Sequence, residues 1–265
     1  MSPDPLGGLD SAEAVKILPR HLAGPGPMDL KTAWPFPFDE NWALHQLDED
    51  TAYTHSPCLR LWTRFAAHPT SLDKGTWTIA ANHRPFESAV WRISLDATTP
   101  IELLHDLHAR LLDLYLEDRD SDHDRLFADT TAPHEAYTPL LARGWSHDIK
   151  TDGTQTFRSP DGHGTVRHWY AADGILGSAG PQWLAWSGPK PRPHWQARFS
   201  FSTPPTLVAA FTASLISTEP LQRTVQDIAF PTRQHLRVAN PTTKQPPSYS
   251  PVAPPPAASA AGRPR

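Results

Sequence analysis

The chain has 265 residues and a formal net charge of −4, and hydrophobic residues make up 38% of it, below the roughly 45–50% of typical globular domains. Its single cysteine, Cys58, excludes an intramolecular disulfide, and no apolar run approaches a signal peptide or the roughly 18 residues of a membrane-spanning helix. We therefore expect a cytoplasmic protein without a membrane segment.

The chain begins with an irregular lead-in over residues 1–19, and a first repeat unit is expected over residues 20–116. This unit opens with the turn sequence His21-Leu-Ala-Gly-Pro-Gly26. In its last predicted strand, Trp91, Ile93 and Leu95 alternate with polar residues, which is typical of a half-buried strand. The strands predicted for the unit cover residues 43–47, 51–54, 59–65, 77–81 and 90–95.

A helix is predicted to follow this strand, over residues 100–115. Thr99 is the expected N-cap, with Pro100 at the first helical position and Glu102 completing a capping box. Apolar residues fill one broad arc of the helix, and charged residues fill the opposite side. The apolar arc consists of Ile101, Leu104, Leu107, Leu111, Leu112, Leu114 and Tyr115.

A charged segment over residues 117–125 is expected to link the two units. Asp118, Asp120, Asp122 and Asp129 fall at positions 1, 3, 5 and 12 of a calcium-binding loop. Position 6 of such a loop requires glycine for its sharp turn, and this chain has His123 there. We therefore predict a hydrated linker that holds no metal.

The second repeat unit is expected over residues 126–217. Residues 132–143 favour a helix that Pro139 interrupts, and the turn Ser159-Pro-Asp-Gly162 predicts a hairpin between residues 154–158 and 165–170. A strand over residues 195–201 and a helix over residues 204–216, with Thr203 as N-cap, end the unit.

Tryptophans and Ser-Pro pairs recur between the two units at a nearly constant offset. Trp91 to Pro100 matches Trp195 to Pro204 at an offset of 104, and Trp77 matches Trp183 at 106. At an offset of 103, Trp42 and Ser56-Pro57 match Trp145 and Ser159-Pro160. Because tryptophan is rare, this agreement indicates an internal duplication.

The last segment, residues 218–265, has ten of the 30 prolines and six Lys or Arg against two acids. Such a composition cannot bury enough apolar surface to fold, so a disordered Pro-rich tail is predicted. The first 217 residues then carry −8, which disfavours nucleic acid as a partner. The fold class is therefore α+β: two homologous repeats, each a short antiparallel sheet with a covering C-terminal helix, paired with pseudo-two-fold symmetry.

The combination of these motifs resembles the SPDY domain, an actinobacterial domain of unknown function that commonly occurs in two copies per protein. The resemblance rests on His21-Leu-Ala-Gly-Pro-Gly26, Ala142-Arg-Gly-Trp145, Ser159-Pro-Asp-Gly162 and the strand-Thr-Pro-helix endings, and it covers about residues 18–217. The first copy departs from the pattern at Ser56-Pro-Cys-Leu59. The family implies no activity, cofactor or catalytic residue.

Candidate reactive groups do not form a complete site in the sequence. His105 and His108 lie at i and i+3, but zinc needs two more ligands, so packed histidines are expected. Cys58 near His55 suggests a nucleophile and base, although an incidental thiol is the simpler interpretation. The glycines of residues 174–180 have the wrong spacing for a dinucleotide turn. We therefore predict no catalytic, cofactor-binding or metal-binding residues and no cofactor.

Trp91 and Trp195 are expected in the core rather than on a stacking surface. Without a reactive motif, the favoured function is a non-catalytic module that binds a protein or peptide. An enzyme with a site between the repeats is the alternative, and a nucleic-acid-associated protein is the third possibility. The sequence leaves the oligomeric state open.

Overall fold

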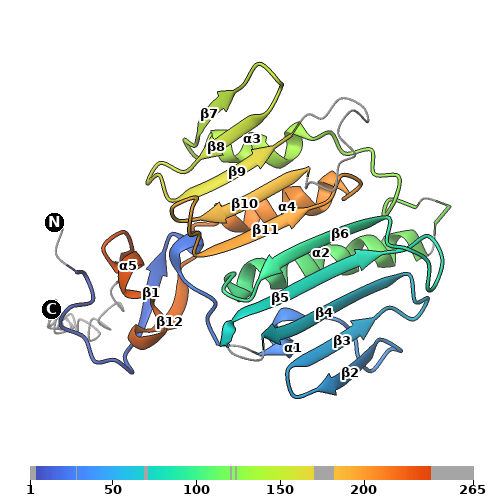
Figure 1. Cartoon of the computed structure of the whole chain (residues 1–265), viewed down its shortest axis with the longest axis horizontal. Helices are drawn as coiled ribbons and strands as arrows, with labels where there is room; N and C mark the ends of the chain where they lie inside the picture. The colour runs from blue at the N-terminus through green and yellow to red at the C-terminus, as the bar shows by residue number, and fades with distance from the viewer. Residues whose placement is uncertain are drawn as a thin grey trace, which may run out of the picture.

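The computed structural model describes residues 4–27, 29–68, 71–119, 121–122, 124–169 and 182–239. Most of these residues build one antiparallel sheet of ten strands in the order β2-β3-β4-β5-β6-β11-β10-β9-β8-β7 (Figure 1). The strands are β2 (Ala43–Asp48), β3 (Thr51–His55), β4 (Leu61–His68), β5 (Ser71–Ala81), β6 (Trp91–Asp96), β7 (Ser146–Ile149), β8 (Gln155–Arg158), β9 (Gly164–His168), β10 (Trp183–Ser187) and β11 (Trp195–Phe199).

Helices cover one side of this sheet. The side is occupied by α1 (Leu30–Ala33), α2 (Ile101–Arg119), α3 (His134–Ala142) and α4 (Pro205–Leu215). In Figure 1 the long helices lie behind the strands, and the strands face the viewer. The chain is therefore an α+β protein whose sheet has one face covered by helices, and among the described residues no helix covers the other, which we call the helix-free face.

The elements run in the same order on both sides of the central strand pair. A helix, five strands and a second helix follow one another as α1, β2–β6 and α2, and again as α3, β7–β11 and α4. The strand register matches as well, because Trp77 pairs with Leu95 and Trp183 pairs with Phe199. At the centre, β6 and β11 are antiparallel with Ser94 opposite Arg198.

The core lies between the sheet and the helices. The inward residues of β6 and β11 alternate as predicted, and Trp91 and Trp195 are each 1% exposed. Their partners on α2 and α4 include Leu104, Leu107 and Phe211. Each such side chain contributes about 1.5–3 kcal/mol by leaving water, so this shared layer holds the two halves of the sheet together.

The two threonines do not cap the helices that follow them. Within the described residues the buried hydroxyl of Thr99 has no hydrogen-bond partner, and α4 has Pro204 at its N-cap position. The first helical N–H groups instead find acceptors in the segments that precede α1 and α3. Ile101 N donates to the carbonyl of Pro25, and Thr206 N donates to the carboxylate of Asp129.

The lead-in and the tail are also more ordered than predicted. Residues of both form a small antiparallel sheet in which β1 (Ala14–Leu18) lies between β12 (Leu221–Thr224) and β13 (Arg237–Ala239). The 3-10 helices η1 (Arg20–Leu22) and η2 (Val225–Asp227) and the short helix α5 (Phe230–Arg233) accompany it. The prediction of disorder is therefore wrong for residues 221–239, and residues 240–265 lie outside the described part.

Arg223 shows why these short elements fold. Its side chain is 1% exposed and forms a two-pronged ion pair with Glu102, with both nitrogen–oxygen distances at 2.7 Å. It also donates to the carbonyl oxygens of Ala23 and Gly24. Glu102 thus binds β12 instead of completing a capping box, and this link fixes the small sheet on α2.

Candidate functional site

The two Ser-Pro turns occupy equivalent places in the sheet. Ser56-Pro57-Cys58-Leu59 joins β3 to β4, and Ser159-Pro160-Asp161-Gly162 joins β8 to β9. In each turn the serine hydroxyl accepts a backbone N–H, from Leu61 at 3.2 Å and from Gly164 at 2.7 Å. The fourth residue of each turn has a positive φ, 58° at Leu59 and 77° at Gly162, which only glycine adopts without strain.

The second turn holds a histidine–carboxylate pair in which His21 is buried and Asp161 is partly exposed. His21 Nε2 lies 2.9 Å from a carboxylate oxygen of Asp161, and this carboxylate also accepts from the Ser159 hydroxyl and from His163 N. Burial alone would raise the pKa of Asp161, but these donors, His21 first, lower it well below its usual value. The pair adjoins a cavity of about 360 Å³ whose lining includes Arg143, Trp145 and His235.

This arrangement does not form a nucleophile relay. A serine nucleophile needs the imidazole between its hydroxyl and the carboxylate. Here Asp161 lies between Ser159 and His21, and the serine hydroxyl already accepts from Gly164 N. The group of three residues therefore stabilises the turn and holds η1 against the second half of the sheet.

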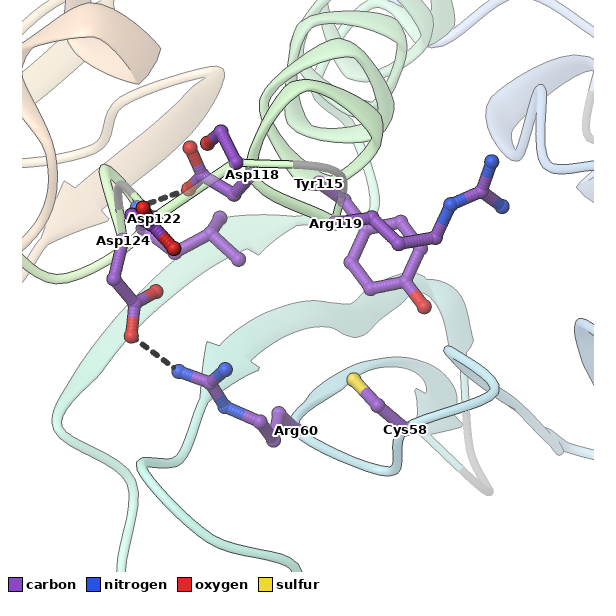
Figure 2. A pocket seen from close by; sticks show the side chains of 9 residues that line it. Cys58, Arg60, Tyr115, Asp118, Arg119, Asp122 and Asp124 are labelled. Atoms are coloured by element: carbon purple, nitrogen blue, oxygen red, sulfur yellow. Dashed lines mark hydrogen bonds and ion pairs between the residues drawn. The ribbon is translucent and has the colours of Figure 1, made fainter.

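The first turn borders a cavity of about 340 Å³ at the end of α2 (Figure 2). Cys58 and Arg60 face Tyr115 and the carboxylates of the linker, and Arg60 pairs with Asp124 at 2.7 Å. Burial, together with the thiol of Cys58, raises the pKa of Tyr115 to about 12. The tyrosine therefore stays protonated and contributes no charge to the cavity.

Cys58 and His55 do not act on each other. Nδ1 of His55 contacts the carbonyl of Ser56, and its Nε2 lies 3.3 Å from Nε2 of His45. The thiol of Cys58 instead lies 3.3 Å from the Ser56 hydroxyl. A nucleophile–base pair therefore does not form at this turn.

The carboxylates of the linker point to separate partners. Asp118 accepts from Leu126 N and pairs with Arg125, Asp124 pairs with Arg60, and Asp129 binds the first turn of α4. Asp120 and His123 lie outside the described residues. Within the described part of the chain, no group of three His, Cys, Asp or Glu side chains is placed to hold a metal ion.

The two helical histidines are also separated by their hydrogen bonds. His105 Nδ1 lies 2.7 Å from the carbonyl of Thr32, whereas His108 is buried with Nε2 at 3.1 Å from the Thr63 hydroxyl. Burial lowers the pKa of His108 to about 3. It is thus a neutral core residue. The glycines at 174–180 lie outside the described residues.

The helix-free face of the sheet carries a row of side chains that crosses all ten strands. Cross-strand partners share a face, so the register defines this row without ambiguity. Three arginines lie in it, and Arg92 and Arg158 lie in the two rows on either side of it. In order, the row contains His45, Tyr53, Arg64, Thr78, Ser94, Arg198, Leu184, Arg167, Thr156 and Asp148.

Aromatic side chains accompany the arginines on this face. Tyr53 lies between His55 and Trp62, with ring centroids 5.7 and 6.2 Å away. Arg167 covers Trp169 and Trp186 at 5.5 and 5.2 Å. A cavity of about 550 Å³ opens beside Tyr53 and Trp62. Its lining includes Phe86, which is 93% exposed.

Sequence reasoning missed this surface. Each arginine occupies an outward position in a strand whose polar and apolar residues alternate, so each could be recognised from the sequence as a polar residue of a half-buried strand. Their alignment in one row depends on the strand order, which the sequence did not give.

The comparisons with known proteins give a family and no activity. The family model for SPDY, described as a domain of unknown function (DUF317), matches residues 55–116 and 158–221. No curated protein and no solved structure matches the chain. Among the described residues, no helix has the length and apolarity needed to cross a membrane. The resemblance seen in the sequence is therefore confirmed: the chain carries the SPDY domain, in two matched segments that are consistent with two copies.

Proposed function

We propose that the protein is a non-catalytic protein- or peptide-binding module, and that its helix-free sheet face is the binding surface. The observation that supports this most is the combination of Trp, Tyr and Arg on one uncovered sheet. These three residue types contribute most of the binding energy in protein interfaces. Trp62 and Tyr53 are half-buried on this face, and Arg64, Arg92 and Arg158 are exposed.

We also propose that the ten-stranded sheet arose from two homologous repeats related by a pseudo-two-fold axis through the Ser94–Arg198 pair. These residues differ by the repeat offset of 104, so equivalent positions of the two units face each other. A reciprocal exchange supports the same axis. Trp91 Nε1 donates to the carbonyl of Leu126, at the start of the second unit, and Trp195 Nε1 donates to that of His21, at the start of the first.

The two cavities at the Ser-Pro turns favour a structural role over catalysis. A catalytic acid or base needs a titratable group that is free to exchange a proton with a substrate. Asp161 and Asp124 are each engaged by side chains of the chain itself. This supports the binding hypothesis over the enzyme hypothesis.

Single-stranded nucleic acid is the second candidate partner. Arginines interleaved with aromatic rings on an open sheet are also the pattern of single-strand binding surfaces. The acidic composition of the first 217 residues, −8 in formal charge, does not describe this face, because its arginines are gathered on one side.

The proposal is tested by capturing a partner from the native host with paired variants. Arg64→Glu/Arg92→Glu changes the helix-free face, and Lys31→Glu/Arg110→Glu makes the same change in charge on the helical side. A partner identified by mass spectrometry should bind the wild type and the helical-side variant equally, by calorimetry with both proteins purified. It should bind the face variant and Trp62→Ala more weakly. Equal binding to all four proteins would refute the proposed surface.

A further inference from the structure

Three arginines of the helix-free face lack the carboxylate partners that many arginines elsewhere have. Away from this face, five ion pairs join Arg20 to Asp106, Arg60 to Asp124, Arg110 to Glu117, Arg125 to Asp118, and Arg223 to Glu102, whereas Arg143, Arg192, Arg233 and Arg237 have no carboxylate partner among the described residues. On the helix-free face, Arg64, Arg92 and Arg158 have no carboxylate partner among the described residues.

The other two arginines of this face are held in position by neutral groups. Nε of Arg198 donates to Gln196 Oε1 at 2.8 Å, and Nε of Arg167 donates to the Thr156 hydroxyl at 3.4 Å. Each guanidinium has five N–H donors in a fixed fork, so one bond leaves the outer edge available. The half-buried carboxyl of Asp96 lies near the row. Burial raises its pKa, and a backbone hydrogen bond from Gln196 and the charge of Arg198 act in the opposite direction.

The structure thereby assigns a chemistry to the partner of this surface: we infer that the helix-free face binds an acidic polypeptide segment. This inference rests on the proposed function and adds the class of its ligand. Guanidinium forks match carboxylates with two parallel hydrogen bonds. The cavity beside Tyr53, Trp62 and Phe86 would accept an apolar side chain of the same segment.

The spacing of the row fits an extended peptide. Neighbouring strands lie about 4.8 Å apart, so Arg64 and Arg198, three strands apart, are about 14 Å from each other, and Arg167 is about 10 Å further. An extended chain advances about 3.3 Å per residue. Carboxylates three or four residues apart would therefore reach successive arginines, and a ten-residue peptide would span all three.

The aromatic rings of this face favour a polypeptide over nucleic acid. Stacking of bases requires rings with a free face. Tyr53 is enclosed by His55 and Trp62, and Trp186 is only 5% exposed and lies beneath Arg167. Trp186 therefore supports Arg167, and neither of these two rings presents a free face to a base.

The test uses a fluorescein-labelled peptide of ten glutamates and a labelled thymidine decanucleotide, with binding measured by fluorescence anisotropy. We expect the peptide to bind the full-length wild type and to weaken as salt rises from about 50 to 300 mM. Arg64→Glu/Arg92→Glu should weaken it by about tenfold, whereas Lys31→Glu/Arg110→Glu should stay within about twofold of wild type. Arg64→Gln/Arg92→Gln, which adds no repulsion, should give an intermediate loss.

Two results would overturn the inference. If the glutamate peptide does not bind, or binds the face and helical-side variants equally, the acidic-partner inference is wrong. The proposed function survives that result only if a captured partner still depends on Trp62. If the oligonucleotide binds more tightly than the peptide and loses affinity in the face variant, the surface is a nucleic-acid surface, and both proposals fail.

Discussion

His108 is the residue whose environment has the clearest thermodynamic consequence. Its imidazole is fully buried on the side of α2 that faces Thr63, and burial lowers its pKa from 6.5 to about 3. The folded protein keeps this histidine neutral at pH values where the unfolded chain protonates it. Folding is therefore linked to proton release at this position.

From this linkage we predict acid destabilisation through His108. Between pH 6.5 and 3 the unfolded state binds the extra proton, so stability is complete above pH 6.5 and falls as the pH drops. The loss from this residue by pH 5 should be about 2 kcal/mol. Urea unfolding of wild type and His108→Gln at pH 7.5 and pH 5 measures it. An equal loss in both proteins would show that His108 is not responsible.

At the start of each long helix, the acceptors come from segments distant in sequence. The Thr-Pro pairs predicted helix starts within two residues, but not the groups that receive the N–H bonds. Asp129 accepts from Thr206 N at 2.8 Å and also from Thr131 N. Burial alone would raise the pKa of Asp129, and these backbone bonds outweigh it and lower the pKa.

We therefore predict opposite outcomes for two substitutions near helix starts. Asp129→Ala should destabilise the protein by about 1 kcal/mol, as is usual when a capping carboxylate is lost. Thr99→Val should be neutral or stabilising, because the buried Thr99 hydroxyl has no partner among the described residues and valine removes it at nearly constant shape. Thermal unfolding of both variants tests this. If Thr99→Val lost more stability than Asp129→Ala, the threonine would be the helix cap after all.

The small sheet depends on the ion pair between β12 and α2. Removing Arg223 leaves the Glu102 carboxylate and two backbone carbonyls without their donor. We expect Arg223→Ala to cost about 3 kcal/mol. In a double-mutant cycle, adding Glu102→Gln should recover part of this loss of stability, because it removes the Glu102 charge that Arg223 no longer pairs. Additive losses would mean that the two side chains do not interact.

At the scale of the whole molecule, the sequence predicted the elements better than their assembly. Residues 43–47, 90–95 and 204–216 were expected as elements and are found at 43–48, 91–96 and 205–215. Alternation and periodicity are local properties, so they are visible in one sequence. The small sheet was missed because β1, β12 and β13 are short, lie far apart in the chain and have no apolar run sufficient to fold alone.

The candidate surface was missed for a related reason. Arg64, Arg167 and Arg198 belong to three strands that are far apart in sequence, and only the strand order aligns them. The net charge disfavoured an anionic partner, because it sums the paired acids of the helical side and the unpaired arginines of the helix-free face. The domain limits drawn from the repeat remain predictions.

The central claim is that a partner contacts the helix-free face, and site-specific photo-crosslinking tests it most directly. The photoreactive residue p-benzoylphenylalanine would be placed at position 64 on the sheet in one variant, and at position 110 on α2 in the other. After irradiation of the native host, we predict a protein adduct from position 64 and none from position 110. An adduct from position 110 alone would contradict it.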